Sequence, residues 1–418
     1  MRFSSCPRGQ RLGESYFGLI FMGKDANHHE SIGILKTSNL ILKEVKMSEK
    51  RVMVIGIGRV GNFALEFLVR TKEIDSLFVA DSDNEMGLSR TRAAIYGAAH
   101  MGYYPTVEFV HLDLNNIEET ASILNKIAPD VILNFATFLS AVRLLTELPP
   151  DMLKKFKTVA TFGIWLPSQL VLSYKLMQAV KKANIKTHVI VSGLPDVVCP
   201  VLGKVGLAPT VGLGNIDNFV PELKKLVAER LRIHMRDVSL CMIFHHVFGD
   251  LVKFGGIEKV PYYLKIFALN EDVTQKFNLT QLLIEAHSQI QTESRTAASG
   301  VKNVLALLNN TREVTHAPGP QGLPGGYPVR LGSEGAEVVL PRDVSMQQAI
   351  RINEEQQKHE AIERIEDDGA VVYTEPVVEF MKETLGYDCS RIELNENEEK
   401  AKELLSRFRE LVAKCGKK

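Results

Sequence analysis

The chain has 418 residues, and its 50 basic side chains balance its 50 acidic ones, so its formal net charge at pH 7 is zero. A neutral chain lacks the positive charge that attracts nucleic acid or an anionic membrane surface, so we expect neither partner. Hydrophobic residues make up 45% of the chain, enough for two or three domains with sizeable cores. No uninterrupted apolar run reaches the ~20 residues of a membrane span.

The cysteines are odd in number, scattered and without CxxC spacing. They are Cys6, Cys199, Cys241, Cys389 and Cys415. This pattern argues against a disulfide framework and a zinc site. It predicts a reducing compartment, the cytoplasm, and no metal site.

Residues 1–46 mix Gly, Ser, Asn and His with short apolar pieces and show no sustained period. We expect an extension that is disordered or that comes from a misassigned start at Met1, because Met47 precedes the first strand as a natural start would. A targeting segment is the weaker alternative, since no clear basic region precedes the apolar piece.

The most informative pattern is a short apolar run, Val52 to Ile55, that leads directly into Gly56-Ile57-Gly58-Arg59-Val60-Gly61. In a dinucleotide-binding fingerprint the first glycine permits the tight turn, and the second lets the backbone approach a pyrophosphate. The third lets the following helix pack closely against the sheet. The helix N-terminus then receives the phosphates.

A second apolar run, Leu77 to Ala80, ends in Asp81, twenty residues after Gly61. A carboxylate at this place binds the ribose hydroxyls and favours NAD over NADP. Arg90 and Arg92 lie about ten residues further on, where we expect a solvated helix face rather than a site for a 2′-phosphate.

Strands and helices alternate after Asp81. We expect strands at 107–110, 131–136, 188–192 and 210–213, and helices at 117–127 and about 166–182. This rhythm predicts an α/β fold with a doubly wound parallel sheet, a Rossmann NAD-binding domain over residues 47–214. Ligands bind at the carboxyl ends of such strands. The residues expected to contact NAD are therefore Gly56, Ile57, Gly58, Arg59, Val60, Gly61, Asp81, Asn134, Phe135, Ala136 and Ser192.

Over roughly Arg51 to Arg364 the order of motifs resembles the lactate/malate dehydrogenase superfamily. The matching segments are Ser192–Asp196, Gly212–Asp217, the helix Glu222–Leu231, Ser239–Asp250 and Gly325–Gly332. In that family they read as an Asn-Pro loop, an Asp before a helix, a His just before Gly-Asp, and a strand pair ending in a Pro-Val-hydrophobic-Leu-Gly turn. The resemblance implies an α+β substrate domain over residues 215–418.

Several of the family's functional positions differ here. Asp217 matches the acid that orients the catalytic histidine, but the substrate-carboxylate arginine falls on Val220. The loop asparagine is replaced by Gly193 or Leu194. By position, Arg143 corresponds to the mobile-loop arginine.

An ungapped count puts the family's histidine on Phe248, and His246 lies two residues earlier, on the same face if the segment is a strand. Histidine suits the proton transfer that accompanies hydride transfer near pH 7. We therefore expect His246 as the acid/base, His245 as the second candidate, and Asp217 as the residue that orients the ring. The alternative is one satisfied core histidine and one exposed histidine. A metal-binding pair is disfavoured, because neighbours on a strand point to opposite faces.

Arg143, Arg232 and Arg330 are the candidate substrate-binding residues, although exposed ion pairs are the commoner fate of such side chains. Loss of the carboxylate-binding arginine argues against a simple 2-hydroxy acid as substrate. We expect an NAD-dependent dehydrogenase for another small polar molecule, and the C-terminal helices suggest a homo-oligomer. Two alternatives are an NAD-requiring family 4-type glycosidase, whose metal-binding Cys has no counterpart near Asn215, and a non-catalytic NAD-binding sensor.

Overall fold

The computed structural model describes residues 49–138, 145, 147–254, 260–286 and 293–415. The predicted extension at 1–46 and the candidate Arg143 lie outside these residues. Within the described part, residues from Ser48 onward cluster as one unit. The boundary expected near residue 214 stays a prediction.

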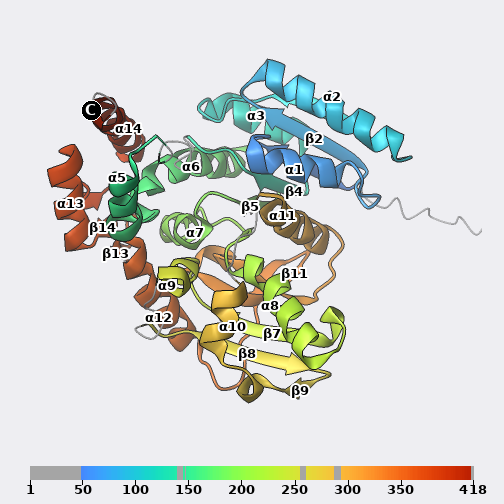
Figure 1. Cartoon of the computed structure of the whole chain (residues 1–418). Coiled ribbons are helices and arrows are strands. Elements are labelled where there is room, and N and C mark those ends of the chain that lie inside the picture. Colours follow the sequence, from blue (N-terminus) through green and yellow to red (C-terminus); the bar gives the residue numbers. More distant parts are fainter. Residues whose placement is uncertain (1–48, 139–144, 146, 255–259, 287–292, 416–418) are drawn as a thin grey trace, which may run out of the picture. The chain divides into compact units, whose positions relative to one another are not determined.

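A six-stranded parallel sheet in the order β3-β2-β1-β4-β5-β6 forms the first half of the described chain (Figure 1). Its strands are β1 (Arg51–Ile55), β2 (Ser76–Asp81), β3 (Val107–His111), β4 (Val131–Asn134), β5 (His188–Val191) and β6 (Val211–Gly212). This order, 3-2-1-4-5-6, is that of the Rossmann fold. The predicted fold class is confirmed.

Both faces of this sheet are buried, which explains why its strands are continuous apolar runs. In β1, Val52 and Val54 face one core, while Met53 and Ile55 face the other. The first core is covered by α1 (Arg59–Leu68), α2 (Asn84–His100) and α11 (Glu293–Leu308). The second is covered by α3 (Ile117–Ile127), α6 (Leu166–Ala183) and α7 (Pro195–Lys204). Between β4 and α6 the chain forms α5 (Pro150–Lys155), η1 (Phe156–Ala160) and η2 (Gly163–Trp165).

A second, antiparallel sheet has the order β7-β8-β9 and its own apolar core. Its strands are β7 (Val238–Ile243), β8 (Tyr263–Ala268) and β9 (Glu271–Asp272). Nearby lie the helical segments α8 (Ile216–Leu231), η3 (Met235–Asp237), α9 (Phe248–Phe254), η5 (Thr274–Lys276) and α10 (Leu279–Ala286).

The Pro- and Gly-rich stretch 314–326, which reads as a long loop, is instead partly strand. It contributes β10 (Val314–Pro318), η6 (Pro320–Gly322) and the start of β11 (Gly326–Gly332), which pairs with β12 (Gly335–Val338). Tyr327 and Val329 pack into the same core as α11 and β1. Burial on the strand's inner face therefore outweighs the turn tendency of its Gly and Pro residues.

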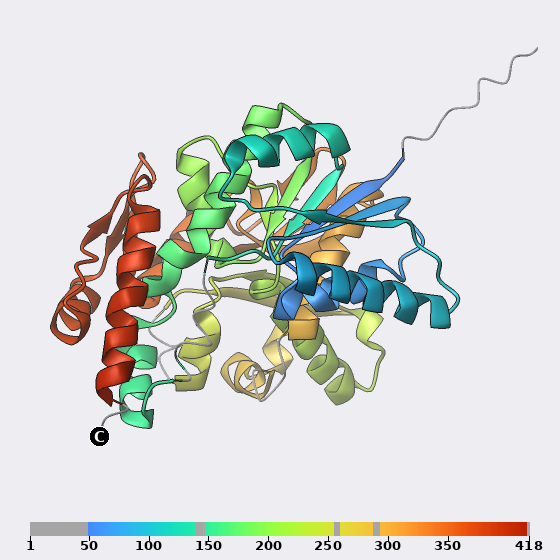
Figure 2. The ribbon, with the colours of Figure 1, turned by 90° about the horizontal axis from the view of Figure 1, so that it is seen from above.

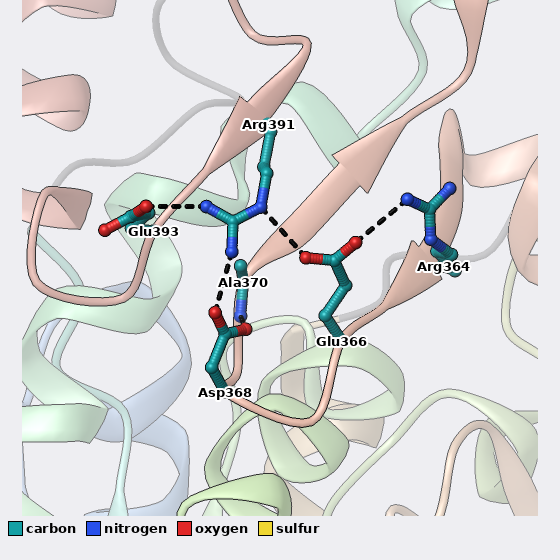
Figure 3. Close-up of polar contacts among 6 residues, drawn as sticks. All are labelled: Arg364, Glu366, Asp368, Ala370, Arg391 and Glu393. Carbon is teal, nitrogen blue, oxygen red and sulfur yellow. Dashed lines mark hydrogen bonds and ion pairs between the residues drawn. The ribbon is translucent and has the colours of Figure 1, made fainter.

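The C-terminal part folds into α12 (Met346–Gln357), η7 (Lys358–Glu360), β13 (Ile362–Ile365), β14 (Val371–Tyr373), α13 (Glu375–Leu385), β15 (Arg391–Ile392) and α14 (Asn397–Cys415). Helix α14 lies beside α6 (Figures 1 and 2). Charged side chains join the strand β13, the turn that follows it and β15 (Figure 3). Among the described residues, none of the helices is long and apolar enough to span a membrane.

Candidate active site

The glycine loop after β1 has the geometry that a dinucleotide requires. Gly56 has φ +81°, and a Cβ at this residue would lie 2.5 Å from the backbone nitrogen of Ala136. Only glycine fits there. By contrast, a Cβ on Gly58 would meet nothing within 4 Å. The loop is thus closed on the sheet side and open where a pyrophosphate would approach the N-terminus of α1.

A cavity of about 420 Å³ lies at this loop. Its wall includes five residues expected to contact the cofactor: Gly56, Gly58, Asp81, Phe135 and Ala136. Further lining residues come from the segments that follow β2, β3 and β4, among them Ser82, Asp113, Asn115 and Thr137. The cavity therefore lies at the carboxyl edge of the parallel sheet, where this fold binds ligands.

Asp81 holds the shape of this loop as well as facing the cavity. Its two carboxylate oxygens accept hydrogen bonds from the backbone N–H groups of Ile57, at 2.9 Å, and Asp83, at 3.0 Å. The half-buried Arg90 donates to the backbone oxygen of Ile57, so the expectation that it lies on a solvated helix face is wrong; Arg92 is exposed. Arg90, which lies on α2 and 33 residues after Ile57 in the chain, thus supports the glycine loop.

The other predicted cofactor residues divide into supports and open positions. Asn134 is buried, and its side-chain oxygen accepts from the N–H of Ala136 at 3.1 Å. The N–H of Ser192 donates to the backbone oxygen of Asn134 at 3.0 Å. Ile57 is buried in the core beneath the loop, Val60 is half-buried, and the packing of Gly61 leaves no room for a side chain. Arg59 is exposed and forms an ion pair with Glu293.

The two adjacent histidines lie in a turn and not on a strand. Strand β7 ends at Ile243 and helix α9 begins at Phe248. The rings of His245 and His246 lie side by side, with centroids 4.7 Å apart and planes 32° apart. The expectation that the two rings diverge to opposite faces is therefore wrong, because strand alternation ends before them.

His246 lies between two buried carboxylates. Its Nδ1 is 3.0 Å from Oδ2 of Asp196, and its Nε2 is 2.9 Å from Oε2 of Glu360. The second contact has the separation of an ion pair but does not meet hydrogen-bond geometry. Asp196 is the second residue of α7, and Asn215, just before α8, donates to the same Oδ2. We call Asp196, Asn215, His245, His246 and Glu360 the histidine cluster.

The resemblance implies that Asp217 orients His246, but the structure places Asp217 elsewhere. Its carboxylate pairs with Nζ of Lys302 on α11, at 2.8 Å. Asp217 lines a different cavity, of about 530 Å³, between α8, α11, β7 and β10. Asp217 therefore joins α8 to α11, and the acid that contacts the ring of His246 is Asp196.

Burial and charge act in opposite directions on the two histidines. Burial lowers the pKa of His245 to about 3, so this ring is neutral. Burial also disfavours the charged form of His246, but Glu360 and Asp196 outweigh it and hold its pKa well above the usual value. The pKa of Asp196 is lowered, because His245, His246 and Asn215 together overcome the effect of its burial. The cluster is thus an imidazolium held by carboxylates, with a neutral ring beside it.

Four atoms of this cluster are buried without a hydrogen-bond partner: Nε2 of His245, Oδ1 of Asp196 and both carboxylate oxygens of Glu360. The side chains of Asp196 and Glu360 are 0% and 1% exposed, and that of His246 is 18% exposed. Buried polar atoms are nearly always paired in native proteins, so unpaired ones call for an explanation such as a ligand or an ion.

The remaining candidates for substrate binding lie apart from these groups. Arg232 is exposed and ends α8 in a left-handed conformation. Arg330 lies on β11, with Nη1 3.8 Å from Oε1 of Glu337. Neither is among the residues that line the two cavities.

Two members of the histidine cluster escape sequence reasoning. Glu360 closes the run Glu354–Glu360, whose charged residues predict a solvated helix surface or an oligomer contact, yet it is fully buried. Asp196 belongs to the Ser192–Asp196 motif, and its place five residues after the buried strand β5 and next to Pro195 is a usable signal for the carboxyl edge of the sheet.

Comparisons with known proteins agree with this architecture. The family model for the saccharopine dehydrogenase NADP-binding domain matches residues 52–146. The fold is that of a Rossmann dehydrogenase. No curated protein sequence matches the chain.

Solved structures extend the likeness beyond the first sheet. A lactate dehydrogenase from a Medee basin deep-sea metagenome library has 12% identity and a TM-score of 0.53, with 75% of this chain and 97% of that chain covered. The apo malate dehydrogenase from Picrophilus torridus has 15% identity and a TM-score of 0.52, with 75% and 96% covered. The lactate dehydrogenase from Eimeria maxima with NADH and oxamate has 14% identity and a TM-score of 0.53, with 75% and 92% covered. At these identities the resemblance to lactate and malate dehydrogenases is one of fold. With the family model, it supports an oxidoreductase that uses a nicotinamide dinucleotide.

Proposed function

We propose that this protein is an NAD-dependent oxidoreductase that transfers a hydride between nicotinamide and a hydroxyl or carbonyl carbon of a small polar substrate. The observation that carries the proposal is the shared location of two features. The glycine-loop cavity and the histidine cluster both lie at the carboxyl edge of one parallel sheet.

The strand order supports this arrangement. The glycine loop follows β1 and Asp81 ends β2, on the half of the sheet that binds the adenosine part in this fold. Asp196 follows β5 and Asn215 follows β6, on the other half. A dinucleotide that crosses the sheet from β2 toward β5 would bring its nicotinamide toward the cluster.

The cluster has the chemistry that hydride transfer needs. When a hydride leaves an alcohol carbon, negative charge grows on the oxygen, and a nearby group must take the proton or stabilise the charge. His246 is the group proposed for this work, and Asp196 replaces Asp217 as the residue that positions the ring. Val220 stands where a carboxylate-binding arginine would be, so the proposed substrate is not a simple 2-hydroxy acid.

The residues around Asp81 favour NAD, even though the matching family model is of an NADP-binding domain. A 2′-phosphate placed at the end of β2 would meet the carboxylates of Asp81 and Asp83. Arg90, a cation on α2, is engaged with the backbone oxygen of Ile57. Repulsion between like charges then opposes NADP.

Calorimetric titration of the full chain with NAD and NADP tests the cofactor. We expect NAD to bind more tightly, and Asp81→Asn to weaken NAD binding about 10- to 100-fold, since hydrogen bonds to a charged group are worth about 1.5–3 kcal/mol. Asp83→Asn is the matched control. Asp83 caps α2 by accepting from the N–H of Met86 at 2.9 Å, and asparagine caps helices equally well. Tighter binding of NADP to the unmodified chain would overturn the preference.

A screen that follows nicotinamide absorbance then tests the reaction, with hydroxy acids, polyols and sugar phosphates as substrates. Reduction of NAD by one class establishes the activity. Tight NAD binding without turnover by any class would count against a dehydrogenase and favour a non-catalytic sensor.

A further inference from the structure

We infer that the histidine cluster binds one divalent transition-metal ion through Asp196, His245 and His246. Binding of the ion follows from the geometry of the cluster alone. The role of the ion in hydride transfer rests on the proposed function.

The ligand atoms of the three side chains lie close together. One ring nitrogen of each histidine and one carboxylate oxygen of Asp196 all lie within 4.8 Å of one another. Two imidazoles and a carboxylate suit zinc, manganese, iron or cobalt better than magnesium or calcium, which prefer oxygen ligands alone. The turn between β7 and α9 makes this possible by putting adjacent histidines side by side.

The surroundings of these side chains are those of a metal site. Glu360 faces Nε2 of His246, the nitrogen opposite the one that faces Asp196. A carboxylate on the far nitrogen of a histidine fixes the tautomer and the ring orientation of a metal ligand. Asn215 does the same for Asp196 by donating to its Oδ2. Both supporting groups are thus in place.

An ion also explains the unpaired atoms. Nε2 of His245 and Oδ1 of Asp196 are buried with no hydrogen-bond partner, and a buried polar atom left unpaired destabilises the folded state. With His246 as a neutral ligand, the two carboxylates of the cluster carry a formal charge of −2, which one dication would neutralise. Without the ion, the imidazolium of His246 compensates only one of these two charges, and the polar atoms stay unpaired.

Three protein ligands leave a coordination position for water or substrate, as in catalytic zinc sites. In the proposed reaction, a substrate oxygen at that position would have its developing charge stabilised by the ion. His246 would then act as a ligand, and the proton would leave the substrate oxygen for solvent. This places the substrate oxygen at the cluster and the carbon that gives up its hydride toward the nicotinamide.

Metal binding is measured on the untagged full chain after treatment with EDTA and dialysis. We expect one equivalent of Zn²⁺ by calorimetry, and one equivalent of Co²⁺ with visible absorption bands of a nitrogen- and oxygen-ligated ion. His245→Ala and Asp196→Ala should abolish both signals. Glu360→Gln, which changes only the supporting group, should weaken binding about 10- to 100-fold.

His188→Ala is the control for histidine removal, because His188 begins β5 and so lies at the amino edge of the sheet. It should bind Zn²⁺ as the unmodified chain does. If the cluster variants fail to fold, the unmodified chain still decides: Zn²⁺ should raise its Tm, and EDTA should reverse the rise. Absence of stoichiometric binding, or equal binding by His188→Ala and His245→Ala, overturns the inference.

Titration with NAD separates this inference from the proposed function. NAD binding without metal binding overturns the metal site alone. Metal binding without NAD binding overturns the oxidoreductase alone.

Discussion

Two clusters of charged side chains in this protein carry the same formal charge in opposite surroundings. The histidine cluster has two carboxylates and one imidazolium, and so a formal charge of −1. The second cluster, which we call the Arg391 network, joins Arg364 and Arg391 to Glu366, Asp368 and Glu393 (Figure 3). Two positive and three negative groups again give −1.

The Arg391 network satisfies itself. All three nitrogens of the Arg391 guanidinium contact a carboxylate: Nε is 2.9 Å from Glu366, Nη2 is 2.7 Å from Asp368, and Nη1 is 2.7 Å from Glu393. Water reaches Arg391, which is 37% exposed. Hydrogen bonds from Arg391 and Arg364 lower the pKa of Glu366. The network needs nothing further, and its role is to join β13, the turn after it and β15.

The histidine cluster is the reverse, because its two carboxylates are buried and four of its polar atoms have no hydrogen-bond partner. An arrangement of this kind persists only where the surrounding fold enforces it, which is why such sites are candidates for function. The number of ion pairs in a cluster therefore says little about its function. The two clusters differ in the burial of their charges and in the number of polar atoms left without a hydrogen-bond partner.

The largest expected effect comes from removing the cation of the histidine cluster. In His246→Ala, two buried carboxylates would face each other without compensation, and we expect a loss of about 3–5 kcal/mol in the free energy of unfolding. Urea denaturation of the variant and the unmodified chain measures the difference. A loss no larger than that of Arg391→Ala would erase the distinction between the clusters.

Local sequence patterns explain which helices and strands of the fold could be predicted from the sequence. The parallel sheet was predictable because strands buried on both faces are continuous apolar runs, and α3 has the bounds that its helical period gave. The run through Val247 and Phe248 is ambiguous, since a short apolar run suits a strand as well as a buried turn and helix. The helix α9 begins there instead.

The partners of His246 were beyond such reasoning. Asp196 lies 50 residues before it in the chain, and Glu360 comes from the last third. Local spacing carries no information about which of many acids the fold brings to one imidazole. The resemblance implies Asp217 as the acid that orients the histidine, but its carboxylate pairs with Lys302 instead.

A third buried histidine isolates the effect of burial without carboxylates. His316 is 3% exposed and accepts a hydrogen bond from the N–H of Met242 at 3.1 Å. Burial, followed by the nearby Lys302 and Lys224, lowers its pKa to about 3. Below pH ~6.5 His316 binds a proton in the unfolded chain but stays neutral in the folded chain. The free energy of unfolding therefore falls as the pH drops from ~6.5 toward 3.

We therefore expect His316→Gln, which keeps an acceptor but cannot titrate, to reduce this loss. The slope for one group is about 1.4 kcal/mol per pH unit, so between pH 6.5 and 5 the variant should lose about 2 kcal/mol less than the unmodified chain. Urea denaturation at the two pH values measures the difference, and the contribution of His245 cancels because both chains contain it. Equal losses would show that His316 is not held neutral.

The smallest expected effect comes from the Arg391 network. Arg391→Ala removes three ion pairs at once, but each is exposed to water, where such pairs contribute little. We expect the Tm to fall by less than about 2 °C, and the difference to shrink further in 1 M NaCl, because salt screens exposed charges beyond about 3 Å. Thermal melts at low and high salt, with Lys402→Ala on α14 as a control that removes one exposed ion pair, measure both effects. A fall of several degrees that persists in salt would mean that the network supports the fold as a buried cluster does, and that exposure does not set the two clusters apart.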